Sequence, residues 1–221
     1  MSRRLVVITA GLSQPSSTRL LADQLTDSVR ARVGARGEGV EVTVIELREL
    51  AVDLATMMTS GGMPSERIRA ARELVSSADG IIAVTPVFAG SYSGIFKMFV
   101  DSLDTDSLNG MPIVIAATAG TPRHSMMLDY AMRPLFGHLR AVVVPTGVFA
   151  ATEDFGGGEG GDALTQRIGR AADELAALMV VDHAGVAGFG ADPVATRRQR
   201  TSGNTIGAVT PFADLLKGHA G

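Results

Sequence analysis

Cysteine and tryptophan are absent from this 221-residue sequence, and histidine is scarce: His124, His138, His183 and His219. Without cysteine the chain can form no disulfide, thiolate nucleophile or iron–sulfur cluster, and none of the usual cysteine zinc sites. The four histidines lie far apart in the sequence, so we expect no metal site. Any reaction that needs a thiolate or a metal ion must therefore be carried out by another chemical group.

Positive charge and stacking aromatic residues are also limited. The chain has 20 Lys and Arg against 23 Asp and Glu, a net charge of −3, with 8 Phe and 2 Tyr. Because nucleic acid binding needs a basic face, we expect no nucleic acid partner. No apolar run approaches the roughly 20 residues of a membrane span, and the short run after Arg4 is too brief for a signal peptide. We expect a cytoplasmic protein without membrane contact.

The sequence does contain a regular alternation of strand and helix patterns. Short apolar runs, typical of strands covered on both faces, lie at 5–9, 40–47, 81–85, 113–117 and 142–144. Helical spacing of apolar residues follows each run, at 21–33, from near Pro64 to 75, and at 95–103, 128–139 and 164–179. Five alternating units predict a doubly wound parallel α/β sheet.

Periodicity alone does not separate a Rossmann from a flavodoxin strand order. In either order, ligands bind beyond the carboxyl ends of the strands, at the switch point. The loops that follow Thr9, Thr85, Ala117 and Val144 are therefore the candidate binding loops.

The first loop, residues 10–18, is rich in hydroxyl side chains just before a helix. Unpaired N–H groups and the helix dipole make such a place an anion site that would fit a phosphate monoester. The alternative is that Ser16, Ser17 or Thr18 only caps the helix. The loop has neither the Gly-x-Gly-x-x-Gly fingerprint nor a Gly-Lys-Ser/Thr motif, which disfavours ATP and Rossmann-bound NAD.

The second loop, residues 85–94, combines a stiffening Pro86 with glycines and the apolar Val87, Phe88 and Tyr92. It suits an aromatic heterocycle, or it is a tight turn with an aromatic plug.

The third loop, residues 118–124, has small residues that permit close approach of a ligand. Arg123 or His124 could meet an anion such as a phosphate of a nicotinamide cofactor. The alternative for His124 is a helix cap or a solvent-exposed position.

Several motifs together resemble a known family. They are TPVFAGSYSGIFK at 85–97, TAGT at 118–121, LDYA at 128–131, Arg133-Pro134 and GVFA at 147–150. Over residues 3–182 the sequence resembles the NADPH-dependent FMN reductases, in particular those that serve two-component flavin monooxygenases such as the alkanesulfonate systems. The end of the chain, 210–216, is similar to a subgroup associated with luciferase-like monooxygenases, although an uninformative tail explains it equally well.

The resemblance implies a flavodoxin-like fold with five strands in the order 2-1-3-4-5, helices on both faces, and FMN bound with NADPH or NADH as reductant. The implied phosphate residues are Ser13, Gln14, Ser16, Ser17 and Thr18. The implied isoalloxazine contacts are Pro86, Val87, Phe88, Ala89, Gly90 and Ser91 on one edge, with Thr118, Ala119, Gly120 and Thr121 bordering the ring. Many relatives carry a basic residue in the first loop. Here Gln14 stands near that place and Arg19 lies just inside the helix, so we expect weak binding of the phosphate, which suits an enzyme that releases reduced FMN.

The leading functional hypothesis is an NAD(P)H:FMN oxidoreductase that hands diffusible reduced FMN to a separate monooxygenase. One alternative retains FMN and reduces a quinone, an azo dye or a metal oxyanion, and another is a flavin-dependent redox sensor or electron-transfer module. Since the flavin performs the hydride chemistry, we name no catalytic side chain. Backbone N–H groups of residues 88–91 are the candidates for stabilising the reduced ring.

Three further expectations concern organisation. Residues 1–185 are expected to form the reductase domain and 186–221 a C-terminal tail that is flexible or packs on the surface. The glycine-rich segment 155–161 is either a flap near the site or a plain connector. The helix at 95–103 is apolar nearly all round, which indicates a homodimer or homotetramer. The residues behind that last expectation are Ile95, Phe96, Met98, Phe99 and Val100.

Overall fold

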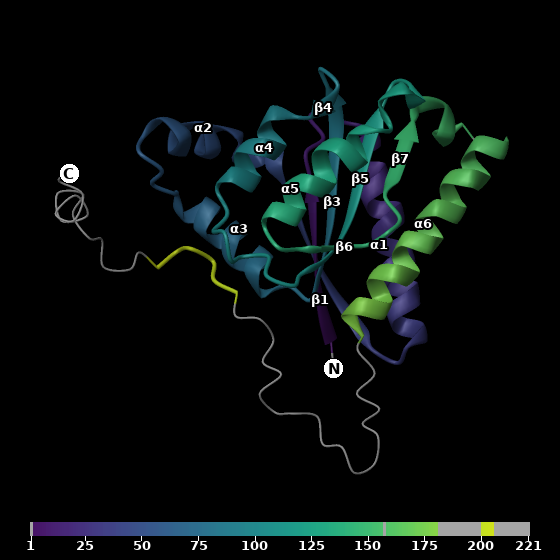
Figure 1. Ribbon diagram of the computed structural model, residues 1–221, viewed down its shortest axis with the longest axis horizontal. Helices are drawn as coiled ribbons and strands as arrows, with labels where there is room; N and C mark the ends of the chain where they lie inside the picture. Colours follow the sequence, from purple (N-terminus) through teal and green to yellow (C-terminus); the bar gives the residue numbers. More distant parts are fainter. Residues whose placement is uncertain (1, 157, 181–199, 206–221) are drawn as a thin grey trace, which may run out of the picture.

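The structure, a computed structural model, describes residues 2–156, 158–180 and 200–205. Its centre is a parallel β-sheet with the strand order β2-β1-β3-β5-β6, drawn with the carboxyl ends of the strands at the top of Figure 1. This is the predicted flavodoxin-like order, in which β5 and β6 are the fourth and fifth parallel strands. The strands are β1 (Ser2–Thr9), β2 (Gly39–Glu46), β3 (Gly80–Phe88), β5 (Pro112–Ala119) and β6 (Val142–Val143).

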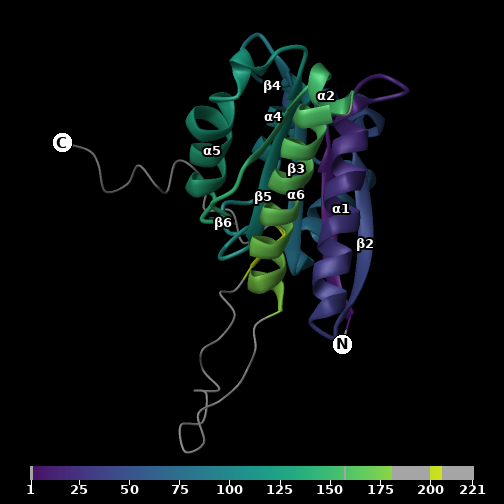
Figure 2. The ribbon, with the colours of Figure 1, turned by 90° about the vertical axis from the view of Figure 1, so that its right-hand side faces the viewer.

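Helices cover both faces of the sheet (Figure 2). On one face, α1 (Ser17–Ala35) packs against α6 (Gly158–Met179). The other face carries α2 (Ala51–Thr59), α3 (Glu66–Ser77), α4 (Gly94–Asp101) and α5 (Arg133–His138). Short helical turns connect these elements: η1 (Leu47–Leu50), η2 (Pro122–His124), the π-helical η3 (Leu128–Met132) and η4 (Thr152–Phe155).

Two hydrophobic clusters bury the sheet from both sides, because successive residues of a strand point to opposite faces. In β3, Ile81 and Ala83 belong to the cluster under α4 and α5, whereas Ile82 and Val84 belong to the cluster under α1 and α6. This two-sided burial explains why the sequence shows continuous apolar runs instead of alternating ones.

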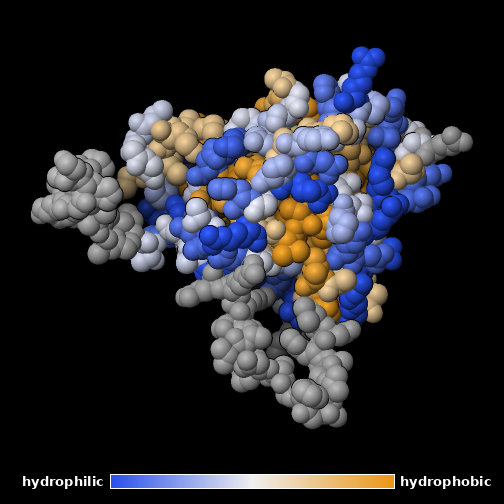
Figure 3. All heavy atoms as spheres, viewed as in Figure 1, coloured by the Kyte–Doolittle hydropathy of each residue, from blue (hydrophilic) through white to orange (hydrophobic). Residues whose placement is uncertain are grey.

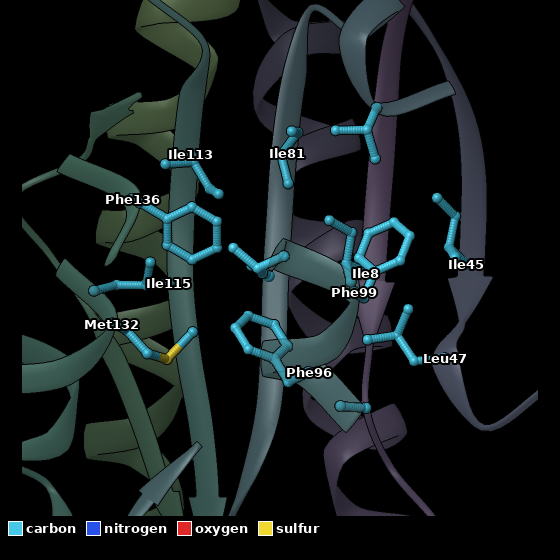
Figure 4. Close-up of a cluster of buried hydrophobic side chains, with 14 of the residues drawn as sticks. Ile8, Ile45, Leu47, Ile81, Phe96, Phe99, Ile113, Ile115, Met132 and Phe136 are labelled. Carbon is cyan, nitrogen blue, oxygen red and sulfur yellow. The ribbon is translucent and has the colours of Figure 1, made fainter. Parts of the chain in front are cut away.

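Three phenylalanines dominate the cluster under α4 and α5 (Figure 4). Phe96 and Phe99 from α4 and Phe136 from α5 are fully buried. The rings of Phe96 and Phe136 meet edge to face, with their centroids 6.1 Å apart. The oligomer prediction was based on five apolar residues of this helix. Three of them, Phe96, Phe99 and Val100, are therefore buried within the core.

The strand count differs from the predicted five, because the described residues form seven strands. The two-residue β4 (Ser91–Tyr92) pairs antiparallel with the end of β3, and β7 (Val148–Ala151) pairs with β5 beyond β6. The fifth parallel strand is therefore divided into β6 and β7.

The interruption between β6 and β7 contains Pro145, which lacks an N–H group for a strand ladder. The guanidinium of Arg133 donates to the carbonyl groups of Val144 and Pro145, both at 3.0 Å. The Glu174 carboxylate accepts hydrogen bonds from the backbone N–H and the hydroxyl of Thr146, at 2.8 and 2.7 Å. Contacts with α5 and α6 thus replace the missing strand pairing.

Helix boundaries also differ in places from the sequence expectation. Helix α2 was not predicted, and α3 begins at Glu66, after Ser65, whose hydroxyl accepts a hydrogen bond from Ile68 N. The helix expected at 128–139 is a π-helical turn followed by α5. The segment 155–161 is mostly helical where it is described, because η4 ends at Phe155 and α6 starts at Gly158.

Residues 200–205 lie against α3 and the loop that follows α4, at the lower left of Figure 1. The guanidinium of Arg200 donates to the carbonyl group of Ala78 at 2.6 Å, and Arg72 Nε donates to the carbonyl group of Ser202 at 2.9 Å. The rest of the expected tail, including 210–216, lies outside the described residues. No helix among the described residues has both the length and the apolar character that a bilayer crossing requires.

Candidate cofactor site

A cleft of about 310 Å³ lies at the carboxyl ends of β1, β3 and β5, where the predicted ligand edge of the sheet should be. Three of the four candidate loops contribute to it, whereas the loop directly after Val144 supplies none of its lining residues. Its lining residues are Leu12, Ser13, Ser16, Ser17, Thr18, Pro86, Val87, Phe88, Thr118, Ala119, Gly120 and Thr152.

The first loop ends at the N-terminus of α1, where Ser16 is the N-cap. Its hydroxyl accepts a hydrogen bond from Arg19 N at 3.2 Å, so the capping interpretation is correct for this residue. Ser17 and Thr18 are the first two residues of α1, and their N–H groups have no acceptor within the helix. Ser13 and Ser17 are exposed at the cleft. Capping and anion binding are therefore compatible in one loop.

Gly11 is required for this loop geometry. A Cβ atom at Gly11 would overlap the Ser16 hydroxyl and lie 3.2 Å from Thr18 Cβ. The backbone thus passes directly beside the helix start, as a cradle for a bound phosphate requires.

Thr18 lines the cleft, and its hydroxyl makes a hydrogen bond to another loop. Its side chain is buried, and its hydroxyl lies 2.8 Å from the hydroxyl of Thr118. Thr18 therefore joins the first loop to the third loop, which fixes the width of the cleft.

The second loop is a β-hairpin. β3 continues through Pro86 to Phe88 and turns at Ala89 and Gly90, whose φ angles are +49° and +78°. Two positive φ angles in a two-residue turn are typical of type I′, the turn that matches strand twist. Pro86, Val87 and Phe88 line the cleft, whereas Ala89, Gly90 and Ser91 lie in the hairpin beyond it.

The remaining aromatic residue of the second loop faces the core. The Tyr92 ring lies 5.9 Å from the Phe96 ring, between centroids, and Tyr92 does not line the cleft. Phe88 is the aromatic side chain at the cleft, and it is 49% exposed.

The third loop contributes Thr118, Ala119 and Gly120 to the cleft. Thr121 instead caps η2, since its hydroxyl accepts from Arg123 N at 3.4 Å. Arg123 and His124 are exposed in η2 and are not among the lining residues.

Two lining residues were missed from the sequence. Leu12 belongs to the first loop but has no polar group that would single it out. Thr152 follows β7, which was not predicted as a strand, so the true end of the fifth strand was placed too early at Val144. The strand signal VFAA at 148–151 could have identified Thr152.

Gln14 faces a second hollow of about 330 Å³ on the outer side of the first loop. That hollow shares Ser13 and Ser16 with the cleft. With its oxygen directed at Arg48, the Gln14 amide accepts hydrogen bonds from both terminal nitrogens of Arg48, one of them at 2.7 Å. The Glu46 carboxylate pairs with both Arg48 and Arg19. Hydrogen bonds to Asp23 and Glu46 raise the pKa of Arg19 above its ordinary value.

The cleft fits a phosphorylated flat ligand such as FMN. One end offers hydroxyls and unpaired N–H groups at a helix start, and the other offers the apolar Pro86, Val87 and Phe88. A Cβ atom added at Gly120 would meet no protein atom within 4 Å, so open space lies beside this residue. Within the described residues, no three His, Cys, Asp or Glu side chains lie together as a metal site would need.

Comparison with known proteins gives a consistent result. The model of the family described as NADPH-dependent FMN reductase matches residues 3–156. The chain is 34% identical over 152 residues to the FMN reductase (NADPH) of Pseudomonas aeruginosa, covering 69% of this chain and 78% of that protein. It is also 34% identical over 181 residues to the NADH-dependent FMN reductase SfnF of Pseudomonas fluorescens, covering 80% of this chain and 94% of that protein.

A solved structure is also similar. The X-ray structure of an oxidoreductase from Corynebacterium diphtheriae is 56% identical in sequence and matches with a TM-score of 0.78. The match covers 80% of this chain and 97% of that one, so the likeness extends over nearly the whole of the solved chain.

Proposed function

The chain belongs to the family of NADPH-dependent FMN reductases, and we propose on this basis that it oxidises NADPH or NADH and reduces FMN held in the cleft. One observation carries the proposal: three loops far apart in the sequence meet around a single cleft that is polar at a helix start and apolar opposite it. FMN has the same division between its phosphate and its ring. The cytoplasm, which supplies both nicotinamide cofactors, is the proposed location.

The phosphate of FMN is assigned to the first loop. Ser13, Ser16 and Ser17 supply hydroxyls, and the N–H groups of Ser17 and Thr18 supply donors at the positive end of the α1 dipole. Thr18 positions the loop through Thr118.

The isoalloxazine ring is assigned to the apolar end of the cleft. Pro86, Val87 and Phe88 border one side, and Ala119 and Gly120 border the other. The hairpin residues Ala89 to Ser91 and the η2 cap Thr121 act by holding these segments in place.

FMN held by these loops would supply the redox chemistry as the acceptor of a hydride, so this chemistry needs no side chain of the protein. None of the described lining residues has an ionisable side chain. The residues of the cleft therefore orient the ring and exclude water, and they do not move a proton. Reduction places negative charge on the ring, and we propose that backbone N–H groups near the hairpin stabilise this charge.

We propose that reduced FMN leaves the cleft and serves a separate flavin-dependent monooxygenase. The first loop itself contains no cationic side chain, and the cleft is an open groove at the surface, which favours exchange over permanent retention.

We still propose a homodimer or homotetramer, but the argument now depends on the apolar residues that reach the surface. Ile95 and Met98 of α4 are only half-buried, and hydrophobic residues reach the surface over the centre of the face in Figure 3, which carries α4 and α5. Val142 in β6 is 44% exposed. A second copy of the chain would cover this apolar surface. Size-exclusion chromatography with light scattering tests it, and a monomer at micromolar concentration would contradict it.

Steady-state oxidation of NADPH and of NADH at increasing free FMN tests the function. The proposal predicts turnover that requires free FMN and saturates with it. Tightly retained FMN with ping-pong kinetics would support the quinone, azo or metal-oxyanion alternative, and negligible turnover would support a sensor.

A further inference from the structure

The phosphate end of the cleft has a charge imbalance. A phosphate monoester carries about −1.5 to −2 charges at neutral pH, whereas a helix N-terminus provides the equivalent of about +0.5. The lining residues of the cleft include no Lys or Arg. Positive charge from beyond the first loop would therefore strengthen the binding of FMN relative to that of riboflavin.

Arg48 is placed to provide that charge. It lies in η1, directly after β2, and β2 is the neighbour of β1, from which the first loop emerges. Its guanidinium contacts the Gln14 amide, as described above, so a cation from another element adjoins the loop where the loop sequence itself has glutamine.

Two carboxylates, Glu46 and Asp23, face the two arginines of this cluster, and the ion pair with Glu46 orients Arg48. Glu46 lies 3.0 Å from Arg48 Nε and pairs at the same time with Arg19. One carboxylate is thus shared by two guanidinium groups. The other acidic partner, Asp23, is half exposed and pairs with Arg19. Solvent therefore screens Asp23 more than it screens Glu46 or Arg48, whose side chains are 18% and 24% exposed.

The arginines and the cleft adjoin the same loop. Arg19 and Arg48 line the outer hollow, which shares Ser13 and Ser16 with the cleft. A phosphate seated against these serines would therefore adjoin the same loop residues as the two arginines.

We propose that Arg48, tethered to the first loop by Gln14 and oriented by Glu46, is a positioning residue that supplies positive potential to the FMN phosphate. This inference rests on the proposed function of the cleft. On this inference, Arg48 makes the protein bind FMN more tightly than riboflavin, which has the same ring but no phosphate.

The test is equilibrium binding of FMN and of riboflavin to the full chain, measured by flavin fluorescence at low and at high salt. Arg48→Gln is expected to weaken FMN binding about tenfold and to change riboflavin binding less than about twofold. The loss should shrink at high salt. Arg48→Lys keeps the charge and should retain most of the preference for FMN.

Two further variants make the test robust. Arg30→Gln removes the same charge from an exposed position of α1 and should leave both affinities unchanged. Gln14→Ala, in an exposed loop position, removes the tether and should weaken FMN more than riboflavin, even if Arg48→Gln fails to fold.

Equal weakening of both flavins by Arg48→Gln and by Gln14→Ala would mean that Arg48 only supports the loop, and the inference would be wrong. Unchanged affinity for both flavins would also overturn it. Failure of the wild-type chain to bind either flavin is a different result, because it would overturn the proposed function itself.

Discussion

The hydroxyl of Thr18 in the first turn of α1 lies 2.8 Å from the hydroxyl of Thr118 at the end of β5. The two residues are 100 positions apart, and both side chains are almost fully buried. A hydrogen bond in this setting joins the phosphate end of the cleft to the loop that borders the ring, so it couples the two halves of the site.

Replacement of Thr18 by valine should therefore destabilise the protein and widen the cleft. The change leaves the Thr118 hydroxyl buried without this partner, which costs about 1–3 kcal/mol. Urea unfolding measures the cost, and Thr18→Ser, which retains a hydroxyl, should lose less. The double variant with Thr118→Val should recover part of the loss, because neither hydroxyl is then left alone. Additive losses would show that the two hydroxyls do not interact.

Gly11→Ala should damage the first loop. The added methyl group would occupy the position of the Ser16 hydroxyl, which displaces the N-cap of α1 at a cost of about 1 kcal/mol and disrupts the phosphate cradle. FMN binding should fall well below that of the wild type.

The matched control for that variant is Gly34→Ala. Gly34 lies near the end of the same helix, with open space where the methyl group would go, and the change should stabilise the protein by up to about 1 kcal/mol. Wild-type flavin affinity in Gly11→Ala would contradict the assigned role of the loop.

Much of the fold follows from local sequence, but the site follows only in part. The buried strands β1, β3 and β5 are continuous apolar runs, so these strands and the three loops after them were predictable, whereas their order in the sheet came from the family resemblance. Pro86, which was expected to begin a turn, instead continues β3 opposite Thr118, and this pairing moves Ala89 to Ser91 out of the cleft.

Other features depend on tertiary contacts that no local pattern shows. The division of the fifth strand depends on Arg133 and Glu174, which are supplied by α5 and α6. The contact between Arg48 and the first loop depends on the pairing of β2 with β1. Motif resemblance identified the first loop but could not identify a cation from a different element.

Phe88→Ala should separate ligand binding from stability. Phe88 is half exposed, so its removal should cost less than about 1 kcal/mol of folding free energy, but the ring of FMN loses an apolar neighbour. We expect FMN and riboflavin to weaken by a similar factor of several-fold, since the phosphate is not involved. Leu178→Ala, at a 40% exposed position of α6 away from the cleft, should change neither affinity. Unequal weakening of the two flavins would argue against a ring contact.

Gly203→Ala should release residues 200–205 from α3. A Cβ atom there would lie 2.7 Å from Asp104 Cβ and overlap the Arg72 guanidinium, and Gly203 has a φ of +65°. Burial is the main cause that lowers the pKa of Arg72, so release of the segment should return that pKa toward its ordinary value. Amide hydrogen exchange should accelerate in α3.

The exposed Thr205 provides the control for this variant, because Thr205→Ala should leave exchange in α3 unchanged. Flavin affinity should stay the same in both variants, since the segment contacts the sheet at the amino ends of its strands, opposite the cleft. A loss of flavin affinity in Gly203→Ala alone would mean that the two ends of the sheet are coupled.

Amide hydrogen exchange of the wild-type chain, with and without saturating FMN, tests the proposed site most directly. The account predicts slower exchange at residues 11–18, 86–88 and 118–120 and at Thr152, with no change at 200–205. Protection confined to other segments, or no protection at high micromolar FMN, would contradict the assignment of the flavin to this cleft.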